Sequence, residues 1–107
     1  MTDREYAKMC VGAGWHSLVD EAYDLCEKYE VEITQIKEKF GQLRIYTSWR
    51  EDVTDDLDEM LWMIESRSSS MCECCGAAAG QRNRGGWIKT ICKFCEEIND
   101  VLAKKGK

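Results

Sequence analysis

The stretch MCECCG at residues 71–76 decides how the C-terminal third of the chain folds. Cys72 and Cys75 within it are separated by two residues, Cys92 and Cys95 repeat that spacing, and 16 residues lie between the pairs. This pattern is typical of structural zinc sites, in which four thiolates bind one ion tetrahedrally. Because protein would then fill every coordination position, no water could be activated, and we expect one structural Zn²⁺ without catalysis.

Cys74 is a third candidate ligand in the first pair, because it stands between Cys72 and Cys75. Gly76 favours the outer pair, since a turn around a metal often needs a positive φ just after its second ligand and glycine adopts one at low cost. We therefore predict that Cys74 is not a ligand.

Other uses of the cysteines are buried thiols, a rubredoxin-like iron site and a thioredoxin-like redox pair at Cys92 and Cys95, where a helix N-terminus would lower the thiol pKa. Glu96 and a helical pattern follow the second pair, where an iron site would have glycine. Two equivalent pairs also suit shared metal binding better than redox chemistry, so zinc is the prediction.

The rest of this segment predicts a strand over 77–82, a turn over 83–86, a second strand over 87–91 and a helix that the second cysteine pair opens. The order of knuckle, hairpin and helix resembles the treble-clef zinc finger over residues 72–104, and this resemblance implies a zinc-stabilised unit without a particular activity. The helix has an apolar stripe made by Phe94, Ile98, Val101 and Leu102.

The first 70 residues predict a helix, a β-hairpin and a second helix. A short helix over 3–10 precedes a glycine-containing break, and strands are expected near 31–37 and 42–49, on either side of a charged turn at 37–41 that we expect to be solvated. The first long helix, from Trp15, has its apolar face at Leu18, Ala22, Leu25, Cys26 and Tyr29. The second, capped by Asp52 or Thr54 and ending near Ser68, has its face at Leu57, Met60, Leu61 and Ile64.

We therefore predict an α+β chain with two units: an αββα body at residues 1–70 and a four-cysteine zinc module, treble-clef-like or zinc-ribbon-like, at residues 71–107. Only three serines, Ser68 to Ser70, join the two units. Three residues are too few for a tether, so we expect the module to pack against the body.

Composition narrows the range of partners. The chain has 107 residues and a net charge of −5. It contains no run of about 18 apolar residues, which is the length that a membrane-spanning helix needs. Residues 1–70 hold 16 acidic and 8 basic side chains, whereas residues 71–107 hold 4 acidic and 7 basic ones. This acidity argues against broad coating of nucleic acid. The charged N-terminus is unlike a secretory signal, so we expect a cytoplasmic protein.

The hairpin tip of the module is the candidate partner-binding site. Arg82 and Arg84 flank a glycine turn, where two guanidinium groups could grip a carboxylate or a phosphate, and Trp87 and Lys89 follow on the next strand. Trp87 could fill a protein pocket or stack on a base. The alternative is that the hairpin tip is only solvated and that Trp87 belongs to the hydrophobic core.

Several other residues have ordinary explanations. His16, the one histidine, is expected to pack or cap the start of a helix, and Cys10 and Cys26 to be small buried side chains. Two rows of carboxylates could imitate a phosphate backbone, although solvated helix faces are the commoner reading. These rows are Asp20, Asp24 and Glu27 on one helix and Asp52, Asp55, Asp56 and Glu59 on the next.

Four segments together resemble a group of small uncharacterised proteins encoded by bacteriophages and prophages: GWHSL at 14–18, QIKEKFGQLRIY at 35–46, CECCG at 72–76 and RGGWIKT at 84–90. The resemblance implies a bacterial cytoplasm as the setting and no catalytic residue. We expect a non-enzymatic, zinc-stabilised interaction protein that binds a host or phage macromolecule and could inhibit it; the expected partner is a protein. The alternative is a nucleic-acid-binding regulator that uses Arg82, Arg84, Lys89 and Lys93.

Overall fold

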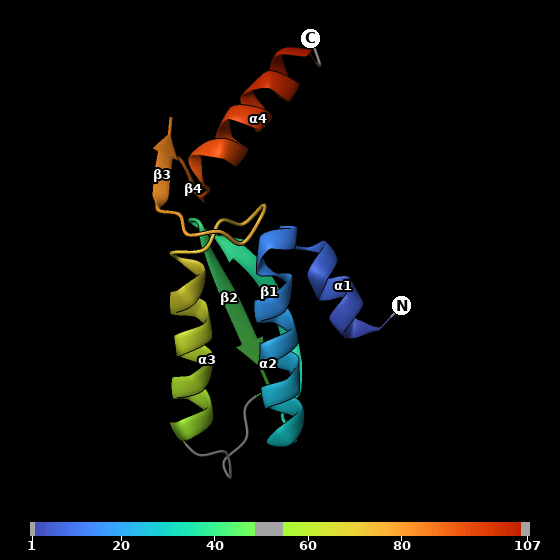
Figure 1. Ribbon diagram of the computed structural model, residues 1–107. Helices are drawn as coiled ribbons and strands as arrows, with labels where there is room; N and C mark the ends of the chain where they lie inside the picture. The colour runs from blue at the N-terminus through green and yellow to red at the C-terminus, as the bar shows by residue number, and fades with distance from the viewer. Residues whose placement is uncertain (1, 49–54, 106–107) are drawn as a thin grey trace.

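The computed structural model describes residues 2–48 and 55–105, and it has the predicted mixture of helices and antiparallel sheets (Figure 1). The elements are α1 (Asp3–Met9), a 3₁₀ turn (Ala13–Trp15), α2 (His16–Lys28), β1 (Ile33–Lys39), β2 (Gln42–Thr47), α3 (Asp55–Ser68), β3 (Gln81–Arg84), β4 (Trp87–Thr90) and α4 (Lys93–Lys105). None of these helices is both long enough and apolar enough to cross a bilayer. The division at residue 70 stays a prediction.

The core lies where α2 and α3, running in opposite directions, pack on the β1–β2 hairpin (Figure 1). Both helices direct the predicted apolar stripes inward, because residues three and four apart share one helix face. The fully buried side chains of this body include Trp15, Leu18, Val19, Leu43 and Leu57. Met60, predicted for the stripe of α3, is partly exposed instead, since it lies toward the flank of that helix.

Strand β1 begins and ends two residues later than predicted. Strand β1 begins at Ile33, which pairs with Thr47, and the strands meet at a tight turn formed by Phe40 and Gly41. Both turn residues have positive φ, 54° and 76°. Strand β1 therefore continues through Lys39, because the tight turn leaves no further residues unpaired.

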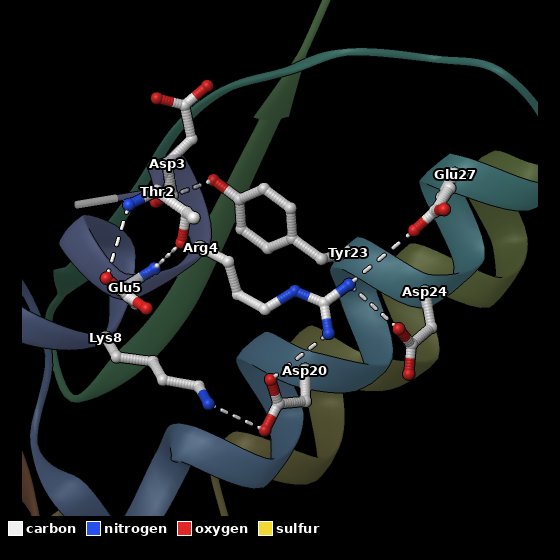
Figure 2. Close-up of polar contacts among 9 residues, drawn as sticks. All are labelled: Thr2, Asp3, Arg4, Glu5, Lys8, Asp20, Tyr23, Asp24 and Glu27. Carbon is white, nitrogen blue, oxygen red and sulfur yellow. Dashed lines mark hydrogen bonds and ion pairs between the residues drawn. The ribbon is translucent and has the colours of Figure 1, made fainter.

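Helix α1 is fixed to α2 by a network of ion pairs (Figure 2). Arg4 reaches Asp24 at 2.8 Å, Asp20 at 3.5 Å and Glu27 at 3.8 Å, and Lys8 lies 2.9 Å from Asp20. The hydrogen bond from Lys8, with the nearby Arg4 charge, lowers the pKa of Asp20. The carboxylates of α2 that were expected to face only water therefore form ion pairs with Arg4 and Lys8 of α1.

The remaining minor predictions have mixed outcomes. His16 is the first residue of α2 and its Nε2 lies 2.7 Å from the carbonyl oxygen of Lys8, which agrees with a packing role. Cys26 is buried as predicted, whereas the prediction for Cys10 is wrong: it lies at the exposed end of α1. Of the second carboxylate row, Asp56 and Glu59 are exposed; Asp52 and Thr54, the predicted caps, lie outside the described residues, as does the side chain of Asp55.

In the C-terminal part, the first strand begins later than predicted. Residues 77–79 pair back toward the end of α3: Ala79 N–H donates to the Ser70 carbonyl at 3.0 Å, and Ala78 bridges Met71. Strand β3 therefore starts only at Gln81 and includes the predicted turn residues 83 and 84. The turn itself consists of Gly85 and Gly86, both with positive φ.

Candidate metal centre

The four cysteines that the spacing predicts come together in the structure. The Sγ atoms of Cys72, Cys75, Cys92 and Cys95 all lie within 4.8 Å of one another, and those of Cys75 and Cys92 are 3.7 Å apart. A tetrahedral site with Zn–S bonds of about 2.3 Å separates its sulfurs by about 3.8 Å. The cluster therefore has room for one metal ion bound by four thiolates.

The cysteine loop, residues 71–77, is shaped by its own backbone. Cys72 N–H donates to the Ala77 carbonyl at 2.7 Å, and Gly76 N–H donates to the Cys72 carbonyl at 2.8 Å. Gly76 has a φ of 82°, which confirms the predicted reason for a glycine after the second cysteine. The other pair is placed by the start of α4, where Cys95 N–H points to the Cys92 Sγ at 3.4 Å.

The electrostatics of the cluster favour the thiolate form of Cys72 and oppose that of Cys75 and Cys95. Burial disfavours the charged form of Cys72, but hydrogen bonds from the backbone N–H groups of Cys92, Cys75 and Cys74 outweigh it and lower the Cys72 pKa to about 6. The hydrogen bond with the Cys92 thiol, aided by burial, strongly raises the pKa of Cys95. Four thiolates this close repel one another, so full ionisation requires a bound cation.

Cys74 lies outside the cluster, as predicted. Cys74 is an exposed residue, and its Sγ is 3.9 Å from the Nδ2 of Asn99. Burial of the sulfur raises the Cys74 pKa, so this thiol is less reactive than a free one at neutral pH.

The cysteine loop packs against the N-terminal body, as the short connection led us to expect, through residues that the sequence analysis did not identify. Gly14 N–H donates to the Glu73 carbonyl at 2.9 Å, and the indole N–H of Trp15 donates to the Met71 carbonyl at 2.9 Å. A Cβ added to Gly12 would lie 2.0 Å from the Glu73 oxygen, and one added to Gly14 would lie 2.0 Å from the Cys72 oxygen. The glycines let two backbones touch, and the G-x-G-W motif next to a helix start was the available signal.

The turn between β1 and β2 makes a second contact with the metal region, by which we mean residues 71–105; it contacts the β3–β4 hairpin. The hydroxyl of Thr90 donates to the Gly41 carbonyl, and Gln81 Nε2 donates to the Phe40 carbonyl at 3.2 Å. A Cβ on Gly41 would lie 3.0 Å from backbone atoms of Lys89 and Thr90. The prediction of a solvated turn is therefore wrong for its tip, where Gly41 is buried, although the Phe40 ring is exposed.

The predicted partner-binding residues lie on the β3–β4 hairpin, and two of their cations are already paired. The Arg82 Nε is 3.7 Å from a Glu96 oxygen, and the Lys89 Nζ is 3.5 Å from a Glu73 oxygen. Trp87 is 67% exposed and is not a core residue. The backbone of Arg84 pairs with Trp87, while the Arg84 side chain lies outside what the structure describes.

Trp87 lies at the edge of a hollow of about 280 Å³. The hollow lies between β4 and α4 and is also lined by Lys89, Ile91, Glu96 and Asn99. An exposed indole beside an apolar hollow is a common core of a protein-binding site.

Comparison of the chain with protein-family models, with curated proteins and with solved structures gives no match.

Proposed function

We propose that this chain is a non-enzymatic interaction protein in which one zinc ion stabilises a protein-binding face. The ion is held by Cys72, Cys75, Cys92 and Cys95 in a treble-clef-like arrangement of knuckle, hairpin and helix. The phage or prophage setting, in a bacterial cytoplasm, follows the resemblance of the four sequence segments. The bound partner is a host or phage protein, whose activity this chain could block.

The donor set supports zinc. Four sulfur ligands suit Zn²⁺ or an iron centre, and hard ions such as Mg²⁺ or Ca²⁺ prefer oxygen. All four tetrahedral positions would be filled by thiolates, which leaves no site for a reacting water. The metal then contributes folding energy, on the order of 10 kcal/mol for such sites, and no chemistry.

The exposure of Trp87 beside the β4–α4 hollow is the observation that carries the binding function. Large aromatic side chains are costly to leave in water, and exposed tryptophans are enriched among the residues that dominate protein interfaces. The metal holds both walls of the hollow, because β4 leads directly into Cys92 and α4 contains Cys95. The binding face would therefore depend on the ion.

The alternative, a nucleic-acid-binding regulator, has less support. Arg82 and Lys89 are ion paired with carboxylates of the same chain, so a phosphate would have to displace Glu96 and Glu73. The net charge of −5 would also oppose approach to nucleic acid.

A pull-down from bacterial lysate with the tagged chain, treated with nuclease, tests this function. Trp87→Ala is the test variant, and Trp62→Ala is its control, because Trp62 is 63% exposed on α3, outside the metal region. We expect a specific protein to be retained by the parent chain and by Trp62→Ala, and to be lost with Trp87→Ala. Recovery of nucleic acid alone, or equal binding by both variants, would contradict the proposed function.

A further inference from the structure

Helix α4 carries an apolar face that nothing in the described part of the chain covers. Phe94 is 69% exposed and Val101 is 51% exposed, and Ile98 and Leu102 lie on the same face. The helix meets the rest of the metal region through its other side, where Glu96 pairs with Arg82. The apolar stripe predicted from the sequence is present, and it is exposed because α4 extends away from the body (Figure 1).

The body carries a matching apolar groove that holds no helix. It lies between α2 and α3, has a volume of about 620 Å³, and has a floor formed by Leu25, Met60, Met63 and Ile64. Methionines adapt their shape to a partner, and a groove between two helices is a common seat for an amphipathic helix.

The two faces agree in length. The groove is lined by residues 21–28 of α2 and 60–67 of α3, and the apolar stripe of α4 runs from Phe94 to Leu102, so each extends over about 12 Å. In Figure 1, α4 extends beyond the end of α2 and α3 where the cysteine loop lies, and it runs away from both helices. The α4 of one chain therefore cannot lie along its own groove and could enter only that of another molecule.

The charges around the groove are balanced. Two acids and two bases flank it, namely Glu21, Asp24, Lys28 and Arg67. An uncharged apolar stripe can therefore enter the groove without burying a net charge.

We propose that α4 of one chain occupies the α2–α3 groove of a second copy, and that the exchange is reciprocal in a two-fold symmetric dimer. The exposed fractions of the four apolar α4 side chains correspond to about 450 Å² per helix. Two such contacts bury about 900 Å² on the two helices, and with the surface of the grooves the total exceeds the roughly 1,000 Å² that a specific interface needs.

Two variants test this dimer. Val101→Glu places a charge on the α4 face, and Met63→Lys places one in the groove; both positions are about half exposed, so the monomer fold tolerates the change. Analytical ultracentrifugation should show a dimer for the parent chain and, for each variant alone, a dimer dissociation constant raised by at least about 30-fold, since a charge is buried at both contacts.

The decisive experiment is to mix the Val101→Glu and Met63→Lys variants and to measure whether they form a heterodimer. One chain then contributes an intact α4 and the other an intact groove, so a 1:1 heterodimer should reappear. A parent chain that is monomeric at every concentration, or a dimer that Met63→Lys leaves intact, would overturn the proposal; the second result would indicate pairing of α4 with α4. Trp87→Ala should dimerise normally, so that failure of the binding function and failure of the dimer are separately visible.

Discussion

Substitution of Gly14 by alanine tests whether the cysteine loop is built onto the body. The added Cβ would lie 2.0 Å from the Cys72 carbonyl oxygen and 2.5 Å from the Gly76 nitrogen, and both are backbone atoms that cannot rotate away. Overpacking of this kind costs about 1–3 kcal/mol. The forced separation would also weaken the hydrogen bonds from Gly14 N–H and from the Trp15 indole, at about 1 kcal/mol each.

The expected loss for Gly14→Ala is therefore about 3–5 kcal/mol of unfolding free energy, a large share of the 5–15 kcal/mol of an ordinary domain. Equilibrium urea denaturation, followed by far-ultraviolet circular dichroism with zinc in excess, measures it. Gly80→Ala is the matched control, because no atom lies within 4 Å of its added Cβ and neither glycine has a positive φ. We expect the control to change stability by less than about 0.5 kcal/mol. If Gly14→Ala is as stable as Gly80→Ala, the packing of the loop against the 3₁₀ turn is wrong.

Three further outcomes are expected. Cys75→Ser should lose stoichiometric zinc and cooperative thermal unfolding, whereas Cys74→Ser should keep both; equal metal content in the two variants, measured by elemental analysis, would contradict the ligand set. Removal of the metal by a chelator should lower the near-ultraviolet dichroism of the buried Trp15, because its indole N–H donates to the Met71 carbonyl of the cysteine loop; an unchanged spectrum would count against this coupling. The pKa of Asp20 is lowered in the folded state, mainly by Lys8, so its ion pair stabilises the docking of α1 above the ordinary carboxyl range and loses that effect as pH falls through the lowered value. The protection of the α1 amides from hydrogen exchange, relative to the intrinsic exchange rate at each pH, should then fall in acid, and Lys8→Gln should reduce this pH dependence; identical pH profiles of the protection would refute the role of the pair.

Local spacing made part of the site predictable. Two residues between cysteines and a glycine after the second one determine a turn within five residues, so the ligand pairs and the positive φ at Gly76 follow from the sequence. The same holds for the amphipathic stripes of α2 and α3, whose period is local.

Contacts between distant segments were not predictable in the same way. The role of Gly14 depends on a loop almost 60 residues later, and the pairing of Arg4 with the α2 carboxylates depends on where α1 folds back. The pattern of α4 correctly indicated an apolar face at Phe94, but a helical period does not say what covers that face, and in this chain α4 leaves it exposed.

X-ray absorption at the zinc edge, on protein purified from cells, tests the central claim most directly. We expect one zinc per chain with four sulfur neighbours at about 2.3 Å and no nitrogen or oxygen neighbour. Protein without stoichiometric zinc, or a spectrum that requires an oxygen ligand, would contradict a metal centre that is closed by Cys72, Cys75, Cys92 and Cys95 and serves only to hold the structure.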